Sequence, residues 1–111
     1  MKILFDQATP VPIRPYLKGH LVRTAAQQGW DRLRNGDLLN AAERDDFDLL
    51  LTTDRNMGYQ QNLAGRKLAI VVLDRQQWPE LRPYIQLVVD AVNGATPGTY
   101  REIQTRLPAR N

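Results

Sequence analysis

The chain has 111 residues, no cysteine and a formal net charge of +3. This length predicts one domain with a single core, and the lack of cysteine excludes disulfides, thiolate metal sites and a cysteine nucleophile. Because no apolar run approaches the roughly 20 residues of a membrane span and the first residues lack a signal peptide's apolar stretch, we expect a cytoplasmic protein without a membrane partner.

Strands and helices are expected to alternate along the first half of the chain. Apolar runs indicate the strands, and Leu38, Leu39 and Ala42 form the apolar face of the longest helix. In chain order we expect a strand at 1–5, a short proline-containing helix up to 17, a strand at 20–24, a helical turn at 25–28, an irregular link at 30–36 and a helix at about 37–44.

The second half continues the alternation and contains the strongest strand signal. Residues 68–73 are apolar throughout, which is typical of a central parallel strand covered on both faces. The helix after Pro79 has apolar residues at three- and four-residue spacing. In chain order we expect a strand at 48–53, a short helix at 56–63, the strand at 68–73, the helix up to Asn93, and an edge strand at 99–104 before a basic tail.

This alternation predicts an α/β fold. About four to five mainly parallel strands, joined by right-handed crossovers, give a three-layer α/β/α sandwich. We expect residues 1–95 to form one domain, to which residues 96–111 add an edge strand or a basic tail.

Two of the predicted strands end in an acid, Asp6 after the first and Asp54 after the third. Ligands of open parallel sheets bind beyond the carboxyl ends of the strands, so these carboxylates can share a crevice, and Asp37 at a helix start can join them. Grouped carboxylates indicate Mg²⁺ or Mn²⁺, which activates a bound water and stabilises charge on a phosphate. Each acid also has a structural explanation, as a turn residue, a first-turn acid or a helix cap.

Polar, aromatic and basic residues extend this predicted site. Asn56 can hold a metal-bound water or a phosphate oxygen, or it can cap the next helix, and Thr53 can hydrogen-bond a site carboxylate. Trp30 and Tyr59 can stack on a base, or they anchor loops to the core. The cations expected to rim the crevice and bind a nucleic-acid backbone are Arg14, Lys18, Arg55, Arg66 and Lys67. The alternative is an ordinary solvated rim.

Several other chemistries lack their residues. The chain contains no serine, which excludes a Ser/His/Asp triad, and His20 is its one histidine, which argues against zinc. Neither G-x-x-x-x-G-K-[ST] nor G-x-G-x-x-G occurs, so no glycine-rich phosphate loop is expected.

The order of the acidic motifs resembles the PIN-like superfamily, and in particular its short toxin-type proteins, from about residue 1 to residue 93. The motifs that carry this resemblance are ILFD ending in Asp6, NGDLL around Asp37, and LLLTTDRN, which contains Asp54 and Asn56.

This resemblance implies a Mg²⁺- or Mn²⁺-dependent endoribonuclease, in some cases the toxin of a toxin–antitoxin pair. It implies Asp6, Asp37 and Asp54 as metal ligands and catalytic residues, and Asn56 takes the fourth position, where an Asp is common. Gln7 stands where related proteins often have an acid or Asn. The implied partners are RNA and an antitoxin protein. Whether the protein also forms a homodimer stays an open question.

Two other functions stay open. A catalytically decayed PIN-like module would bind nucleic acid or protein, with Asn56 marking the lost site. A receiver-type phosphoacceptor domain also has an acid after the first strand and an Asp after the third. Here, however, Gln7 replaces the second acid of the first strand, and the lysine expected after a fifth strand is absent.

Overall fold

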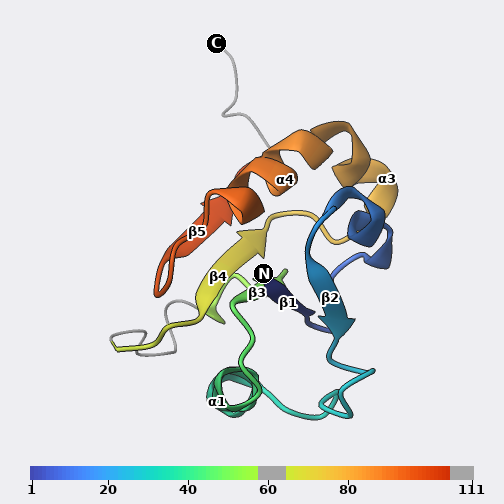
Figure 1. The fold of residues 1–111 in the computed structure, drawn as a ribbon. Helices are drawn as coiled ribbons and strands as arrows, with labels where there is room; N and C mark the ends of the chain where they lie inside the picture. Colours follow the sequence, from blue (N-terminus) through green and yellow to red (C-terminus); the bar gives the residue numbers. More distant parts are fainter. Residues whose placement is uncertain (58–64, 106–111) are drawn as a thin grey trace.

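The computed structural model describes residues 1–57 and 65–105 and confirms the α/β fold. All pairings between neighbouring strands of its sheet are parallel, in the spatial order β2-β1-β3-β4-β5 (Figure 1). The strands are β1 (Lys2–Phe5), β2 (Leu21–Thr24), β3 (Leu49–Thr52), β4 (Ala69–Leu73) and β5 (Tyr100–Ile103). The predicted edge strand is therefore confirmed as β5, and residues 106–111 of the predicted basic tail lie outside the described residues.

Helical segments cover both faces of this sheet. They are η1 (Val11–Tyr16), α1 (Asn35–Arg44), α3 (Trp78–Leu81), η2 (Arg82–Tyr84) and α4 (Ile85–Asn93). Figure 1 shows α1 on one side of the strands and α3 and α4 on the other, which confirms the layered sandwich. Within the described ranges, no helix is long and apolar enough to cross a membrane.

Two helical predictions differ from the structure or cannot be compared with it. The helix expected after Pro79 is divided into α3, η2 and α4, because Pro83 lacks the N–H that a continuous α-helix needs. The helix expected at 56–63 and its aromatic residue Tyr59 fall largely outside the described residues.

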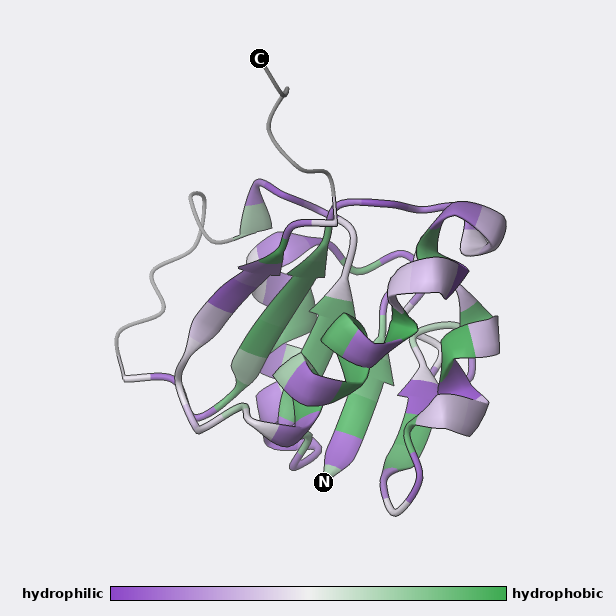
Figure 2. Cartoon of the chain, turned by 90° about the horizontal axis from the view of Figure 1, so that it is seen from above, coloured by the Kyte–Doolittle hydropathy of each residue, from purple (hydrophilic) through white to green (hydrophobic). Residues whose placement is uncertain are grey.

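The core consists of two clusters, one on each face of the sheet. Successive strand residues alternate between them: Leu50 packs with α1, whereas Leu49 and Leu51 pack with α4 and η1. β3 and β4 are buried along their whole length because helices cover both faces. Figure 2 shows the central strands mainly in hydrophobic green, whereas the helices carry both green and purple residues.

Parallel pairing places the last residues of all five strands at the same edge of the sheet, which we call the carboxyl edge. In the sheet, β2 lies on one side of β1. The next strand in the chain, β3, lies on the other side of β1. The switch point of this topology therefore lies between β1 and β3, where open α/β sheets bind ligands.

Candidate functional site

A cleft of about 740 Å³ lies at the carboxyl edge, at the switch point between β1 and β3. Residues that follow β1 and β3 line one part of it, among them Asp6 and Asp54. The link from β2 to α1 lines another part. The prediction that the two strand-end acids share a crevice is therefore in agreement with the structure.

Asp6 is held in place by two hydroxyl groups. Thr9 Oγ1 donates a hydrogen bond to Asp6 Oδ1 at 2.8 Å, and Thr52 Oγ1 donates to Asp6 Oδ2. The backbone N–H of Asp6 donates to the carbonyl of Leu51 at 3.2 Å, which continues the pairing of β1 with β3. Because Thr9 and Thr52 are themselves buried, the carboxylate has a fixed orientation at the cleft.

The pKa of Asp6 is raised above its ordinary value of 3.8. Burial is the largest cause, because it disfavours the charged form, and the negative charge of Asp54 adds to the rise. The hydrogen bonds from Thr52 and Thr9 act in the opposite direction, since they stabilise the carboxylate. A cation in the cleft would relieve both the desolvation and the repulsion between the two acids.

Asp54 combines a local structural contact with exposure to the cleft. Its Oδ1 accepts the backbone N–H of Asn56 at 2.9 Å, which is the contact of an Asx turn. Its Oδ2 accepts no hydrogen bond from the described residues. Asn56 is exposed and lines the same cleft. Both of the roles expected for this segment, a local capping contact and a place in the site, are therefore compatible with the structure.

Thr52 connects the two acids. Its hydroxyl donates to Asp6 and accepts the backbone N–H of Asp54 at 3.0 Å. The sequence had indicated Thr53 for such a contact. Thr52 makes it instead, because successive side chains of a strand point to opposite faces.

Asp37 does not join Asp6 and Asp54. It is exposed in the first turn of α1, and the residues of this helix that line the cleft are Asn35 and Leu38. Neighbouring helix residues point about 100° apart, so the buried face that includes Leu38 turns Asp37 away. Among the residues that the structure describes, no group of three His, Cys, Asp or Glu side chains could hold a metal ion.

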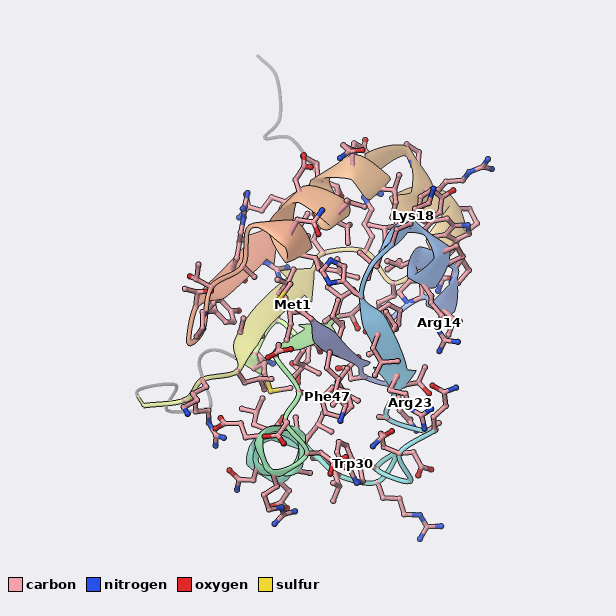
Figure 3. The ribbon with its side chains drawn as sticks, viewed as in Figure 1. Met1, Arg14, Lys18, Arg23, Trp30 and Phe47 are labelled. Carbon is pink, nitrogen blue, oxygen red and sulfur yellow. The ribbon has the colours of Figure 1, made fainter. Side chains whose placement is uncertain are left out.

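Arg55 is the one predicted rim cation, within the described residues, that lines the cleft. Lys18, Arg66 and Lys67 precede β2 and β4, and residues that precede parallel strands lie at the edge opposite to the carboxyl edge. Figure 3 shows that Lys18 also lies on the side of the sheet covered by α3 and α4, whereas Trp30, which lines the cleft, lies on the side of α1. These cations follow the strand-end acids in the sequence, but the chain has returned to the opposite edge before β2 and β4 begin.

The remaining cations have other contacts. Arg66 forms an ion pair with Glu43 at 3.0 Å. Arg14, in η1, donates to the Gln27 side chain at 3.2 Å and is not among the residues that line the cleft.

Two charged residues of the cleft were missed in the sequence. Asp31 and Arg34 belong to the link between β2 and α1, and both line the cleft. The link is expected to be irregular, and Trp30 is the residue in it for which a contact with the substrate is expected. A signal was present, because a segment that directly follows a strand begins at the carboxyl edge.

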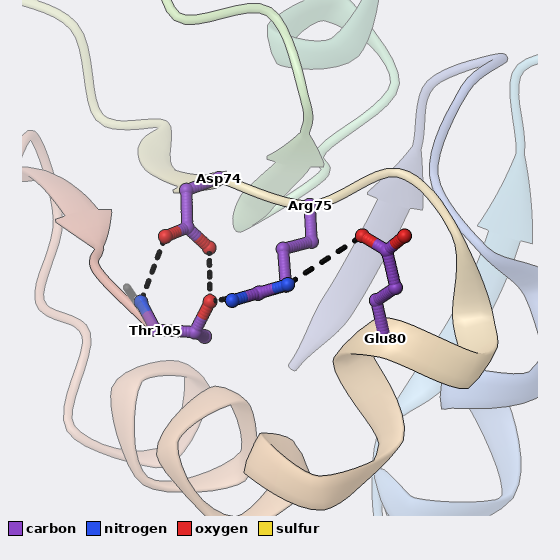
Figure 4. Close-up of polar contacts among 4 residues, drawn as sticks. All are labelled: Asp74, Arg75, Glu80 and Thr105. Carbon is purple, nitrogen blue, oxygen red and sulfur yellow. Dashed lines mark hydrogen bonds and ion pairs between the residues drawn. The ribbon is translucent and has the colours of Figure 1, made fainter. Parts of the chain in front are cut away.

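Asp74 is a third strand-end acid that carries the same signal as Asp54, since it directly follows β4. It accepts the N–H and the hydroxyl of Thr105, both at 2.8 Å (Figure 4). Arg75 Nε donates to the same hydroxyl, and Arg75 Nη1 lies 3.5 Å from Glu80. This network joins the segment after β5 to the end of β4 and gives Asp74 a structural role.

The oxygen ligands of the cleft suit Mg²⁺ or Mn²⁺. Mg²⁺ commonly binds through one or two carboxylates, and waters and substrate phosphate complete its octahedral shell. Asp6, fixed and partly buried, and Asp54, with one oxygen accepting nothing from the described residues, match that requirement. Asn56 adds a neutral amide at the same wall.

Comparisons of the chain with models of protein families, with curated proteins and with solved structures found no match.

Proposed function

We propose that this protein is a Mg²⁺- or Mn²⁺-dependent endoribonuclease whose metal is held by Asp6 and Asp54. The observation that carries the proposal is the pair of carboxylates at the switch point, one of which has a pKa raised by burial and by the charge of the other. The bound metal would supply a water of lowered pKa and stabilise charge on the scissile phosphate.

The protein's own residues orient this chemistry. Thr9 and Thr52 donate to the two oxygens of Asp6 and so fix the orientation in which this carboxylate lines the cleft. Arg55 lies in the same wall as Asp54 and forms no ion pair with a described residue. Its guanidinium is therefore suited to bind a phosphate of the substrate.

The choice of RNA as substrate is supported by the resemblance of the three motifs to the PIN-like superfamily and by the open, cation-bearing cleft. The same resemblance suggests a toxin that an antitoxin protein inhibits in the cytoplasm. Induced expression of the wild-type protein should then slow bacterial growth, and expression of Asp54→Asn should not.

The direct test is cleavage of an end-labelled RNA with millimolar Mn²⁺. We expect cleavage by the wild type, none with EDTA, and at least a 100-fold slower reaction for Asp54→Asn, because the variant removes a proposed metal ligand. Asp37→Asn is the matched control, since its acid is exposed and outside the lining of the cleft. An Asp54→Asn variant that cleaves at the wild-type rate would overturn the proposal.

A binding module is a second candidate, favoured by the finding that two predicted acids line the cleft and Asp37 does not. A metal that binds the native state raises its stability by mass action. If millimolar Mg²⁺ or Mn²⁺ leaves the melting temperature unchanged while RNA still binds, the binding module is the better description.

The strand order favours a third candidate, a receiver-type phosphoacceptor, because the order 2-1-3-4-5 is also that of receiver domains. Asp54 at the end of β3 would then accept the phosphoryl group. Incubation with acetyl phosphate should add the mass of one phosphoryl group to the wild type and not to Asp54→Asn. A phosphorylated Asp54 in a protein that cleaves no RNA would favour this candidate over the nuclease.

A further inference from the structure

The link between β2 and α1 presents an aromatic ring and a cation to the cleft. Trp30 and Arg34 both line it, and both lie outside the proposed metal ligands. The backbone around Trp30 is fixed on both sides: its N–H donates to Ala25 at 2.8 Å, and its carbonyl accepts the N–H of Leu33 at 3.0 Å. The ring therefore projects from an anchored turn.

The Trp30 ring is also fixed by packing. It meets the ring of Phe47 in a T-shaped arrangement with centroids 5.8 Å apart and planes at 68°, and it packs against the core cluster that includes Leu38 and Leu39. It nevertheless stays partly exposed and lines the cleft. A ring that is already ordered can accept a stacked partner at little entropic cost.

Arg34, four residues further along the same link, brings a positive charge to the same cleft. It is exposed, precedes α1 directly and has an extended backbone with φ −130° and ψ 149°. Its side chain forms no ion pair with a residue that the structure describes. The cleft thus has a second cation, on the side formed by the β2–α1 link, in addition to Arg55.

We propose that Trp30 and Arg34 form a nucleotide subsite in which an unpaired base stacks on the indole and the guanidinium binds the adjoining phosphate. This inference rests on the proposed function, because it names the part of the substrate that the cleft holds next to the reacting phosphate. Stacking requires an exposed base face, so the subsite binds unpaired nucleotides and accepts any base.

The test uses the fluorescence of Trp30. The chain has two tryptophans, and Trp78 packs on the other face of the sheet against Tyr16, with ring centroids 5.8 Å apart. In a Trp78→Phe variant, Trp30 is therefore the single indole. We titrate this variant, in EDTA so that cleavage does not interfere, with oligoadenylate and with an abasic ribose-phosphate oligomer of the same length. We expect saturable quenching by oligoadenylate and little quenching by the abasic oligomer.

Affinity measurements on variants of the otherwise wild-type chain separate the two contacts. Trp30→Leu should weaken oligoadenylate binding by about 5- to 150-fold, the usual range for one stacked base, and leave binding of the abasic oligomer nearly unchanged. Trp30→Phe should retain part of the affinity, because it keeps an aromatic face. Arg34→Gln should weaken binding of both oligomers, and Trp78→Leu is the matched control for loss of a partly buried tryptophan.

The outcomes distinguish this subsite from the nuclease itself. Metal-dependent cleavage with a KM that Trp30→Leu leaves unchanged would overturn the subsite and leave the nuclease standing. A base-dependent loss of affinity in a protein that cleaves nothing would support the subsite and remove the nuclease. The subsite is also refuted if Trp30 shows no quenching, or if Trp30→Leu weakens binding of the abasic oligomer as much as that of oligoadenylate.

Discussion

The buried hydroxyl of Thr52 donates a hydrogen bond to Asp6, a residue 46 positions earlier in the chain. The same oxygen accepts the backbone N–H of Asp54. One threonine at the end of β3 therefore fixes an acid at the end of β1 and the backbone of a second acid. This contact is possible because β1 and β3 are neighbours at the switch point of the sheet.

Substitution of Thr52 should therefore impair the site without removing any proposed ligand. We expect Thr52→Val to weaken Mn²⁺ binding by about 10- to 100-fold, the usual effect of losing a group that orients a metal ligand. Thr52→Ser keeps the hydroxyl and should remain near the wild type. The measurement is a Mn²⁺ titration followed by thermal melting. Equal Mn²⁺ affinities for the Val and Ser variants would show that the hydroxyl does not position the acids.

The raised pKa of Asp6 predicts a specific dependence of stability on pH. Because the folded protein holds this proton more tightly than the unfolded chain, stability falls as pH rises from 3.8, the ordinary value, through the raised pKa. Asp6→Asn removes this titration, so its melting temperature relative to the wild type should increase across that window and then level off. Melts at a series of pH values check this, and a difference that is constant with pH would contradict it.

Bound Mn²⁺ should offset the loss of stability that the ionisation of Asp6 causes in the wild type. A cation competes with the proton for Asp6, so the stabilisation by Mn²⁺ should be small at acid pH and grow as pH rises through the raised pKa. In Asp6→Asn, Mn²⁺ should stabilise the protein less. The increase of this stabilisation with pH that Asp6 causes should be absent from the variant. Stabilisation of equal size at all pH values would separate metal binding from Asp6.

The sequence predicts the fold well because its signals are local. Apolar runs and short spacings place all five described strands within one or two residues of their observed bounds. Parallel pairing then follows from the alternation of strands with helices. Asp6 and Asp54 are found for the same reason, since Asp6 directly follows β1 and Asp54 is the second residue beyond the end of β3, so that each strand fixes the place of its acid.

The rest of the site depends on where side chains point and on which edge of the sheet a segment reaches. Spacing in the sequence gives neither. Asp37 is a carboxylate in the first turn of the predicted helix, as a metal ligand there would be. The rotation of α1 that buries Leu38 nevertheless turns Asp37 outward. Arg66 and Lys67 follow Asp54 in sequence, but the chain has crossed to the opposite edge before β4 begins. Asp31 and Arg34 were missed because an irregular link shows no periodicity that would place its side chains.

Asp31 and Asp37 have the same side chain and lie close together in the sequence, so their substitutions can be compared directly. Asp31 lines the cleft and Asp37 does not. We expect Asp31→Asn to lower Mn²⁺ affinity by about 1.5- to 5-fold, the effect of removing one exposed charge near the cation, whereas Asp37→Asn should change it by less. A larger effect of Asp37→Asn would mean that α1 turns toward the cleft when metal binds.

Arg55 and Lys18 form a similar pair of cations. Arg55 lines the cleft, whereas Lys18 lies at the opposite edge of the sheet. Arg55→Gln should weaken RNA binding and reduce the slope of log affinity against log salt by about 0.7, the value for one phosphate contact on a single strand. Lys18→Gln should leave that slope unchanged. Filter binding at several salt concentrations provides the measurement, and equal slopes for Arg55→Gln and the wild type would exclude a phosphate contact.

Asp54 and Asp74 both follow buried strands, yet their contacts predict opposite effects of the same substitution. Asp74 accepts two hydrogen bonds from Thr105, which is 3 % exposed, so Asp74→Asn leaves one of these donors without its acceptor. We expect a loss of about 1 to 3 kcal/mol in the free energy of unfolding, with cleavage by the folded fraction retained. Asp54→Asn should lose cleavage and keep its stability in EDTA. Urea unfolding and RNA cleavage, measured on both variants, give the comparison. An Asp74→Asn protein that is stable but inactive would move the catalytic site toward the end of β4.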